Sequence, residues 1–358
     1  MGEKIMAATQ DKEGEGSALP PQAIVMQMVV GAWISQTISS VTRLDIPDLL
    51  KKHGPQTALK LIQNYGVDAK PDALERALRA CASVGIFTED SGGFFGTTAL
   101  SDVLTSSSSV SAKKFTEIFG GSWWKVWSGL PDALRTGLTQ ASAQLGMDYW
   151  EYCKANQKEM EDFGEAMKSN SHNSIRGVLK YCNLTGIRKV ADIGGSFGHL
   201  TIELLRKYRN LYGIVLEMPD LIPIAQKHLA GENKDIVSRI EFVGGNMFDG
   251  VPGAEVYILK HIIHDWDDTF CIKLLRNCHS AMVGDGRVIC VDAVLPPMGD
   301  TSGTFAKFLD INMMVFHVGK ERTQKQWEAI YHAAGFRIAS ITPLNDNFGT
   351  SIVEGRKM

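Results

Sequence analysis

The chain lacks an excess of positive charge. Its 37 lysines and arginines are outnumbered by 40 aspartates and glutamates, and the formal net charge is −3. Binding to nucleic acid depends on a clustered basic surface that neutralises phosphates. The charge balance therefore argues against nucleic acid as the main partner.

Several other features are scarce. The six cysteines lack the paired spacing of zinc-binding or redox-active motifs, so we expect reduced, mostly core residues of a cytosolic protein. The polar segment Met1–Ser17 has no apolar stretch of the signal-peptide type, and residues 1–20 are predicted to form a disordered tail. The most apolar early segment, Ala23–Ile38, is short and interrupted by polar residues, so we expect that it does not span a bilayer.

The length of 358 residues predicts about two domains, and the first is expected over residues 21–110. Residues 71–81 carry apolar side chains at helical spacing. A short apolar run, a glycine-rich turn at 90–93 and a second apolar run follow, which is the order of a winged helix. Such units bind DNA or pack into dimers. Because the chain is acidic, dimer packing is the favoured interpretation.

Residues 111–180 are expected to be helical. The segment is rich in aromatic residues and methionine, among them Phe163 and Met167. Such side chains are more common in a hydrophobic core, but an aromatic-rich helical segment beside a catalytic domain can also form a pocket wall. We therefore interpret this segment as a candidate substrate cap.

Short apolar strands alternate with helices across residues 181–358. Strands are predicted at 189–193, 211–217, 239–243, 255–263 and 287–292, and helices at 200–208, 221–229, 267–282 and 323–334. This alternation is typical of a doubly wound, mostly parallel sheet. We therefore expect a Rossmann-like α/β catalytic domain here.

A glycine-rich turn, DIGGSFG at residues 192–198, joins the first of these strands to a helix. Glycines such as Gly194 and Gly195 let a ligand approach the backbone closely. The fingerprint of a nicotinamide dinucleotide site, G-x-G-x-x-G, fits neither register of this turn, and the Gly-Lys-Ser/Thr of a P-loop does not follow. A different cofactor is therefore expected.

Polar residues at the ends of three strands indicate which cofactor this turn binds. Asp192 lies directly before the turn, where a carboxylate repels a pyrophosphate but suits an ammonium group. Glu217 can accept hydrogen bonds from two ribose hydroxyls, and Asn246-Met247 offers an amide and an apolar side chain for adenine. Because open α/β sheets bind ligands at the carboxyl ends of their strands, these residues together predict S-adenosylmethionine.

The fourth strand leads into KHIIHDWDD at residues 260–268. Asp265 or Asp267 can cap the next helix, but capping does not account for His264, which is expected to face the crevice of the glycine turn. Methyl transfer from a sulfonium needs an aligned nucleophile and a group that takes its proton. An imidazole can do this for a phenol with a pKa of about 10, and such bases contribute roughly 10²- to 10⁴-fold. His264 is the candidate base, and His261, within the predicted strand, is the alternative.

A catalytic imidazole needs an acceptor that orients its other nitrogen. Asp292, at the end of the next strand, and Glu321, in GKERT at residues 319–323, are the candidates. For Glu321 alone a solvated surface charge would be the simpler explanation. In combination with His264, the orienting role is favoured.

By these motifs the chain resembles the small-molecule O-methyltransferases that include plant caffeic-acid-type and flavonoid enzymes and acetylserotonin O-methyltransferase. The similarity runs from about residue 21 to the end and rests on the segments 78–87, 163–167, 192–198, 264–266 and 320–323. The resemblance implies a winged-helix-like dimerisation domain, a helical substrate cap, and a Rossmann-like domain that converts S-adenosylmethionine to S-adenosylhomocysteine without a metal.

The resemblance also implies roles for single residues. It makes His264 the general base, flanked by Glu321 and Asp292. It places the cofactor at Ser171, Asp192, Gly194, Gly195, Glu217, Asn246, Met247 and Lys260. It places the acceptor, a small hydroxylated aromatic molecule, at Phe163, Met167, Trp266, Met313 and His317.

The chain departs from the usual residues of the family at four positions. Asn246 and Glu217 stand where aspartate is common, Asp292 where plant members have glutamate, and His317 where asparagine is frequent. The shorter side chain of Asp292 shifts the orienting role toward Glu321. The imidazole of His317 can hydrogen-bond a polar group of the acceptor.

Three alternatives remain open at this point. The same fold can methylate nitrogen or use the cofactor for hydroxylation, decarboxylation or ring closure, although the presence of both His264 and Glu321 argues against a repurposed site. A cofactor-sensing DNA-binding protein would need a basic run, which residues 73–95 lack. A metal-dependent catechol methyltransferase would need an Asp/Asp/Asn cluster and is disfavoured, because the His264-Asp265 pair resembles the metal-free arrangement. We expect a cytoplasmic homodimer that binds neither nucleic acid nor membrane.

Overall fold

The computed structural model describes residues 19–344, 346 and 348–358. The tail predicted at residues 1–20 therefore lies almost wholly outside the described residues. The chain divides into two compact units, Met1–Gly121 and Ser122–Met358. Each unit has a hydrophobic core of its own.

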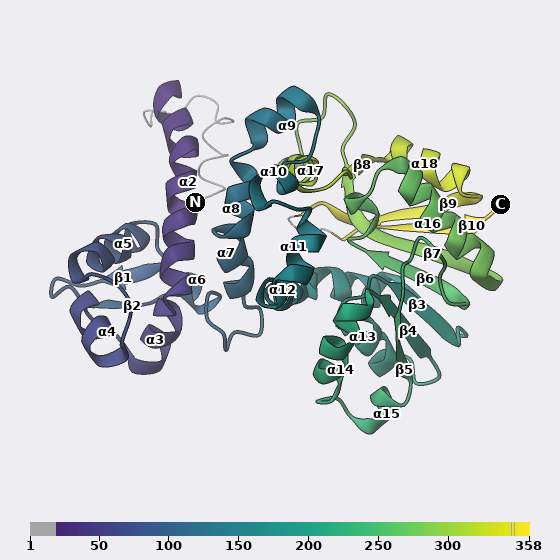
Figure 1. The fold of residues 1–358 in the computed structure, drawn as a ribbon, viewed down its shortest axis with the longest axis horizontal. Coiled ribbons are helices and arrows are strands. Elements are labelled where there is room, and N and C mark those ends of the chain that lie inside the picture. The colour runs from purple at the N-terminus through teal and green to yellow at the C-terminus, as the bar shows by residue number, and fades with distance from the viewer. Residues whose placement is uncertain (1–18, 345, 347) are drawn as a thin grey trace, which may run out of the picture. The chain divides into compact units, whose positions relative to one another are not determined.

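The first unit is helical with one small hairpin (Figure 1). Its elements are α2 (Pro21–Arg43), α3 (Ile46–His53), α4 (Ala58–Tyr65), α5 (Pro71–Ser83), β1 (Phe87–Glu89), β2 (Phe95–Thr97), α6 (Ala99–Asp102) and α7 (Lys113–Phe119). The predicted helix at 71–81 and the hairpin after it are confirmed, with β1 antiparallel to β2. Leu78, Phe87 and Phe95 are buried together in the core of this unit.

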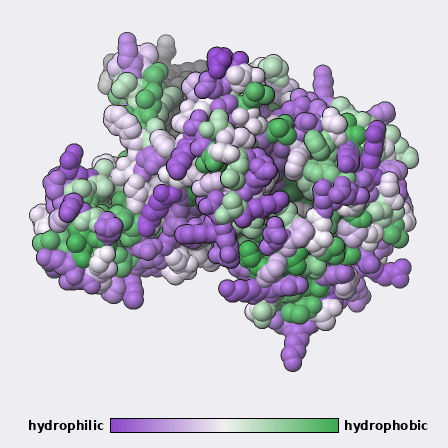
Figure 2. Space-filling view, in the orientation of Figure 1, coloured by the Kyte–Doolittle hydropathy of each residue, from purple (hydrophilic) through white to green (hydrophobic). Residues whose placement is uncertain are grey.

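Helix α2 carries apolar side chains that are exposed. Those more than half exposed are Val25, Met26, Met28, Val29 and Trp33, and hydrophobic residues are visible along the helix in Figure 2. Its 23 residues are long and apolar enough to cross a membrane by length and composition alone, a test that helices of soluble proteins also pass. The expectation that this segment is too short was wrong, because the helix continues beyond Ile38 to Arg43.

The second unit begins with a run of helices. These are α8 (Ser122–Trp127), α9 (Leu130–Thr136), α10 (Ala141–Leu145), α11 (Tyr149–Ala155) and α12 (Gln157–Tyr181). The helical character predicted for residues 111–180 is thereby confirmed. Asp148 caps α11, because its side chain accepts hydrogen bonds from the backbone N–H groups of Trp150 and Glu151. Aromatic residues of these helices pack around the buried Tyr149.

An eight-stranded sheet forms the body of the second unit. The strands are β3 (Lys189–Ile193), β4 (Tyr212–Glu217), β5 (Ile240–Gly244), β6 (Ala254–Lys260), β7 (Met282–Leu295), β8 (Arg322–Thr323), β9 (Phe336–Pro343) and β10 (Thr350–Lys357). Their order is β5-β4-β3-β6-β7-β10-β9, with β8 paired to β7. The strands β3 to β7 pair in parallel, whereas β10 is antiparallel to β7 and β9. This confirms the mostly parallel, Rossmann-like sheet.

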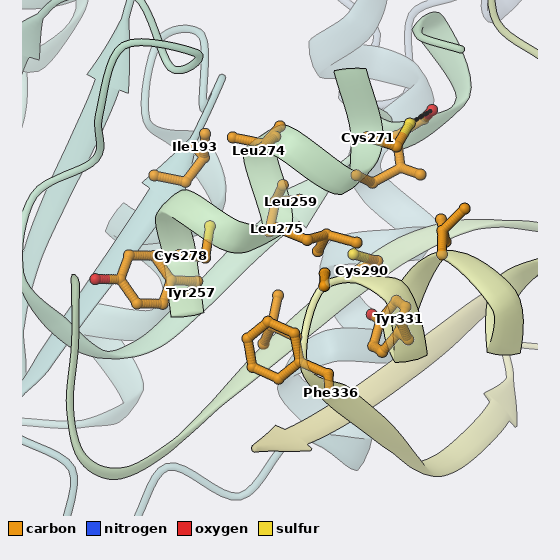
Figure 3. Close-up of a cluster of buried hydrophobic side chains, with 14 of the residues drawn as sticks. Ile193, Tyr257, Leu259, Cys271, Leu274, Leu275, Cys278, Cys290, Tyr331 and Phe336 are labelled. Atoms are coloured by element: carbon orange, nitrogen blue, oxygen red, sulfur yellow. Dashed lines mark hydrogen bonds between the residues drawn. The ribbon is translucent and has the colours of Figure 1, made fainter. Parts of the chain in front are cut away.

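Helices cover both faces of the sheet (Figure 1). They are α13 (His199–Lys207), α14 (Ile222–Leu229), α15 (Lys234–Val237), α16 (Asp268–Ala281) and α18 (Gln324–Ala333), with 3-10 turns η1 (Pro219–Leu221) and η2 (Ile263–Asp265). Helix α17 (Thr304–Phe316) packs in the core that includes Val126 and Tyr149. Side chains alternate along each strand, so Tyr257 faces α16 and α18 while Ile258 faces the core with α12 and α13. Figure 3 shows the first of these cores, with Leu274 and Phe336 fully buried.

The sheet departs from the sequence prediction at its later strands. The antiparallel strands β9 and β10 were not predicted. β6 ends at Lys260, three residues earlier than expected. The reason is His261, whose φ of 55° takes the backbone out of the extended conformation, a geometry uncommon for residues with a Cβ atom. His261 therefore follows the strand and does not lie within it.

Candidate active site

The glycine-rich turn connects β3 to α13. Gly194 and Gly198 have φ values of 68° and 76°, which only glycine adopts without strain. At Gly195 the need is space: a Cβ atom would lie 2.6 Å from Cγ of Asp192. Gly198 is the N-cap of α13. The turn therefore brings bare backbone next to the carboxylate that ends β3.

Asp192 is buried, and its Oδ2 accepts a hydrogen bond of 2.9 Å from the hydroxyl of Thr201. Burial raises the pKa of Asp192 to about 6, against the opposing effects of that hydrogen bond and the charge of Lys260. The ammonium group of Lys260 donates to Oγ of Ser171 at 2.7 Å, and burial lowers its pKa. An anionic and a cationic group therefore lie close together at the glycine turn, as an amino-acid zwitterion requires.

One pocket brings these groups together. It is lined by Gly164, Met167, Ser171, Ile175, Asp192, Gly194, Gly195, Ser196, His199, Leu200 and Lys260. Five of the predicted cofactor residues lie here, and Met167, predicted for the acceptor, lies with them. His199 was not predicted, although its place as the first residue of α13 is a usable signal.

The other predicted cofactor residues lie at the ends of β4 and β5. Glu217 is half-buried, and loss of water around its carboxylate raises the pKa of this group. The carboxylate accepts backbone hydrogen bonds from Met218 at 2.8 Å and Ser196 at 2.9 Å. Glu217 thus links β4 to the glycine turn. Oδ1 of Asn246 accepts from the backbone N–H of Phe248 at 3.0 Å, which fixes the loop that begins at Gly245 and includes Met247.

His264 lies in the turn η2, directly after β6, and is 8% exposed. The following helix is capped by Asp267, whose side chain accepts from the backbone N–H of Phe270. The capping interpretation is therefore confirmed for Asp267. Asp265 is not the helix cap, so its carboxylate is available for contacts with other side chains.

Two carboxylates lie beside one nitrogen of His264. Nδ1 is 2.7 Å from Oε1 of Glu321, a hydrogen-bond distance, and 3.7 Å from Oδ1 of Asp292. Both carboxylates are buried. The predicted trio of His264, Glu321 and Asp292 is thus brought together from three separate segments, with Glu321 as the direct partner.

These charges set the titration of the cluster. Burial alone would lower the pKa of His264, but the surrounding carboxylates, Glu321 foremost, raise it to about 10. Burial raises the pKa of Asp292 to about 8. His264 is therefore a stronger base than a histidine in water.

The other nitrogen of His264 faces a second group. Nε2 lies 3.6 Å from Oδ1 of Asp265, and Nε2 of His317 lies 3.8 Å from the same oxygen. Burial lowers the pKa of His317, and its ring stacks on Trp150 with centroids 5.4 Å apart. Asp265 therefore stands between two imidazoles, a role that sequence analysis did not assign.

Aromatic and apolar side chains surround His317. Phe163 packs edge-on against Trp150 with ring centroids 5.5 Å apart. Met313 is buried one turn earlier on α17, and its carbonyl accepts from the backbone N–H of His317 at 2.7 Å. Phe163 is therefore linked to His317 through the ring of Trp150, and Met313 is linked to it through the backbone.

Trp266 lies elsewhere. Its ring packs edge-on against Phe248, with centroids 4.6 Å apart, in the loop that follows Asn246. It contacts Phe270 as well. The contacts of Trp266 therefore lie toward the loop expected to hold adenine, and its acceptor role stays a prediction.

Arg322 holds the turn that carries His264. Its guanidinium is buried and donates to the carbonyl oxygens of Ile263 at 2.9 Å and Trp266 at 2.8 Å. It also pairs with Oδ1 of Asp268 at 2.8 Å. This role of Arg322 was not predicted from the sequence, although its place next to Glu321 was a signal.

Known protein families match both units. Residues 26–107 match the O-methyltransferase dimerisation domain, and residues 127–337 match the O-methyltransferase domain. The second match alone covers more than half of the chain.

Individual relatives match over almost the full length. A phenazine O-methyltransferase of Lysobacter antibioticus is 32% identical, covering 96% of this chain and 99% of its own. The mitomycin biosynthesis 6-O-methyltransferase of Streptomyces lavendulae is 30% identical, covering 94% and 96%. The crystal structure of human N-acetylserotonin methyltransferase in complex with S-adenosylmethionine has a TM-score of 0.86 at 26% identity, covering 96% and 99%. The chain therefore belongs to the S-adenosylmethionine-dependent O-methyltransferases that carry an N-terminal dimerisation domain.

Proposed function

We propose that the protein methylates a hydroxyl group of a small aromatic secondary metabolite with His264 as general base. The observation that carries this proposal is the 2.7 Å contact between Nδ1 of His264 and the buried Glu321. That contact orients the ring and leaves Nε2 for the acceptor. Because the pKa of His264 is about 10, close to that of a phenol at about 10, the proton can pass between them with little cost.

The cofactor residues fit the parts of S-adenosylmethionine, which supplies the electrophilic methyl group and its own leaving group. Asp192 would bind the ammonium group and Lys260, with Ser171, the carboxylate. The half-buried Glu217 would accept from the ribose, and Asn246 with Met247 would hold adenine. The bare backbone at Gly194 and Gly195 permits the close approach that this requires.

The acceptor pocket is proposed at the aromatic group around His317. Phe163 and Met313 supply apolar surface and His317 a hydrogen-bonding group, and Met167 would lie toward the cofactor. The helices α8 to α12, which form the part of the predicted cap segment 111–180 that lies in the second unit, would cap this pocket. Relatives are named for O-methylation of a phenazine, for mitomycin biosynthesis and for O-methylation of an isoflavone, which supports an aromatic acceptor here.

The proposal is tested by His264→Ala. We expect turnover to fall roughly 10²- to 10⁴-fold, with the affinity for S-adenosylmethionine, measured by calorimetry, nearly unchanged. The exposed His332 supplies the control variant His332→Ala. Near-normal turnover of His264→Ala would refute the base assignment.

The acceptor is found with isotopically labelled S-adenosylmethionine and a panel of phenols, flavonoids, indoles and polyketides, read by mass spectrometry. Release of S-adenosylhomocysteine in step with an O-methylated product is expected. Label on nitrogen, or product without label, would overturn the assignment.

We also propose a cytoplasmic homodimer that needs no metal for turnover. The dimerisation-domain match and the exposed apolar side chains of α2 support the homodimer. The six cysteines are all unpaired and buried, which fits a reducing compartment.

A further inference from the structure

Three carboxylate oxygens in the interior of the second unit receive no hydrogen bond from the described part of the chain. They are both oxygens of Asp292 and Oε2 of Glu321. Asp292 is 0% exposed and Glu321 2%. Folded proteins pair nearly all such atoms with protein groups, water or ions, because an unpaired buried oxygen costs free energy. The interior beside His264 therefore has unused capacity to bind a positive group.

A second imidazole faces the same carboxylate. Nδ1 of His261 lies 3.7 Å from Oδ1 of Asp292, the same distance as Nδ1 of His264. The positive φ of His261 lets this side chain leave the direction of β6, and the two rings have centroids 5.5 Å apart. One ligand atom from each of the three residues lies within 4.8 Å of the others.

We propose that His261, His264 and Asp292 form a binding site for a divalent cation of the zinc class, and that the bound cation inhibits methyl transfer. Imidazole nitrogen and carboxylate oxygen are the usual zinc ligands, at about 2.0–2.2 Å. Ligand atoms around a tetrahedral ion at that distance lie about 3.3 Å apart. Side-chain adjustments well below 2 Å would bring these three atoms to that spacing.

Inhibition follows from the tautomer of the imidazole, and this step rests on the proposed role of His264 as base. A cation on Nδ1 takes the lone pair that otherwise holds the proton shared with Glu321. From the charged ring this proton is released to solvent, and in the neutral ring it moves from Nδ1 to Nε2. The neutral ring then carries its remaining proton on Nε2. Nε2 has no lone pair left with which to accept the proton of an acceptor hydroxyl.

Binding is tested first with the metal alone. Zinc sulfate is titrated by calorimetry into the full chain after removal of metals by a chelator, and cobalt(II) binding is followed by visible absorption. We expect one saturable site, weakened at least about tenfold in His261→Gln and unchanged in the exposed control His332→Gln. Circular dichroism checks that both variants are folded. Absence of a saturable site, or equal affinity of the two variants, would overturn the proposal.

Turnover is then measured with added zinc. The wild type and His332→Gln are expected to lose activity and to recover it with excess chelator. His261→Gln, compared with its own rate without metal, is expected to need at least about tenfold more zinc for the same loss. Zinc bound without loss of turnover would refute the inhibitory role. A chain that binds zinc through His261 but methylates no acceptor would refute the proposed function and leave the metal site standing.

Discussion

At the residue scale, the site depends on how unlike charges are grouped around one imidazole. Glu321 and Asp292 lie on the Nδ1 side of His264, and Asp265 lies on the Nε2 side. Each stabilises the charged form of the ring. The groups that orient the base therefore also set the pH at which it can act.

This arrangement predicts a change in pH dependence. His264 must lose its proton before it can act as a base, so kcat/KM is expected to rise with pH up to its pKa of about 10. Glu321→Gln removes the charge that contributes most to raising this pKa. The rising limb of the plot of kcat/KM against pH is expected to move to lower pH, while the maximal rate falls.

The measurement is kcat/KM across neutral to alkaline pH for both proteins. The exposed Glu328 on α18 supplies the control Glu328→Gln, which should keep the wild-type profile. An unshifted limb in Glu321→Gln would show that Glu321 does not set the pKa of the base.

Residue types alone predicted part of this site. The pairing of His264 with Glu321, 57 positions apart, follows from matching an imidazole to an orienting carboxylate. The contacts of Asp265 with both His264 and His317 could not be predicted in this way, because they depend on the direction in which η2 turns after β6. The approach of His261 to Asp292 depends on one backbone angle that the sequence does not reveal.

At the element scale, short connections hold the chemistry in place. The glycine turn after β3 and the turn η2 after β6 carry the proposed cofactor and base residues. Each connection depends on close contacts that a small substitution would disturb. A single substitution in each connection is therefore expected to lower binding or turnover.

For the glycine turn, Gly195→Ala places a methyl group 2.6 Å from Cγ of Asp192 and 2.9 Å from a side-chain carbon of Val215. Overpacking of this kind costs about 1–3 kcal/mol. We expect weaker binding of S-adenosylmethionine by calorimetry and a lower free energy of unfolding in urea. Gly250→Ala is the control, because a Cβ atom there meets no atom within 4 Å. Wild-type cofactor affinity in Gly195→Ala would contradict the proposed place of the cofactor.

For η2, Arg322→Lys keeps the charge but loses the planar guanidinium that binds the carbonyls of Ile263 and Trp266 together. Loss of buried hydrogen bonds to a charged group costs on the order of 2–3 kcal/mol. We expect that decrease in the free energy of unfolding, together with a fall in kcat larger than any change in the KM for S-adenosylmethionine. Arg337→Lys, at an exposed position, should change neither. An unchanged free energy of unfolding in Arg322→Lys would contradict the proposed role of the guanidinium in holding η2.

The parallel strands were predictable because each is a short apolar run between helical segments. β3 was predicted over its observed residues, 189–193. β9 escaped prediction because its residues include Arg337, Ser340 and Thr342 and half of it is exposed, so no apolar run marks it. Its place in the sheet comes from pairing with β10, which is a tertiary contact.

At the scale of the whole molecule, α2 offers an apolar surface that a second copy of the chain can cover. Charge on that surface is expected to prevent association. Val29→Glu combined with Trp33→Glu should lower the solution mass from about twice 39.3 kDa to 39.3 kDa, measured by light scattering. Gln22→Glu combined with Gln27→Glu adds the same two charges at exposed polar positions of the helix and should remain dimeric. A double variant that stays dimeric would place the interface elsewhere.

The burial of every cysteine has a practical consequence. All six thiols are inaccessible in the folded chain, and burial raises their pKa values, so little reactive thiolate is available to an alkylating dye. One cysteine introduced at an exposed position in each unit would therefore accept fluorophores without prior removal of the native thiols. Energy transfer between the two dyes would then measure the distance between the two labelled positions with and without cofactor and acceptor.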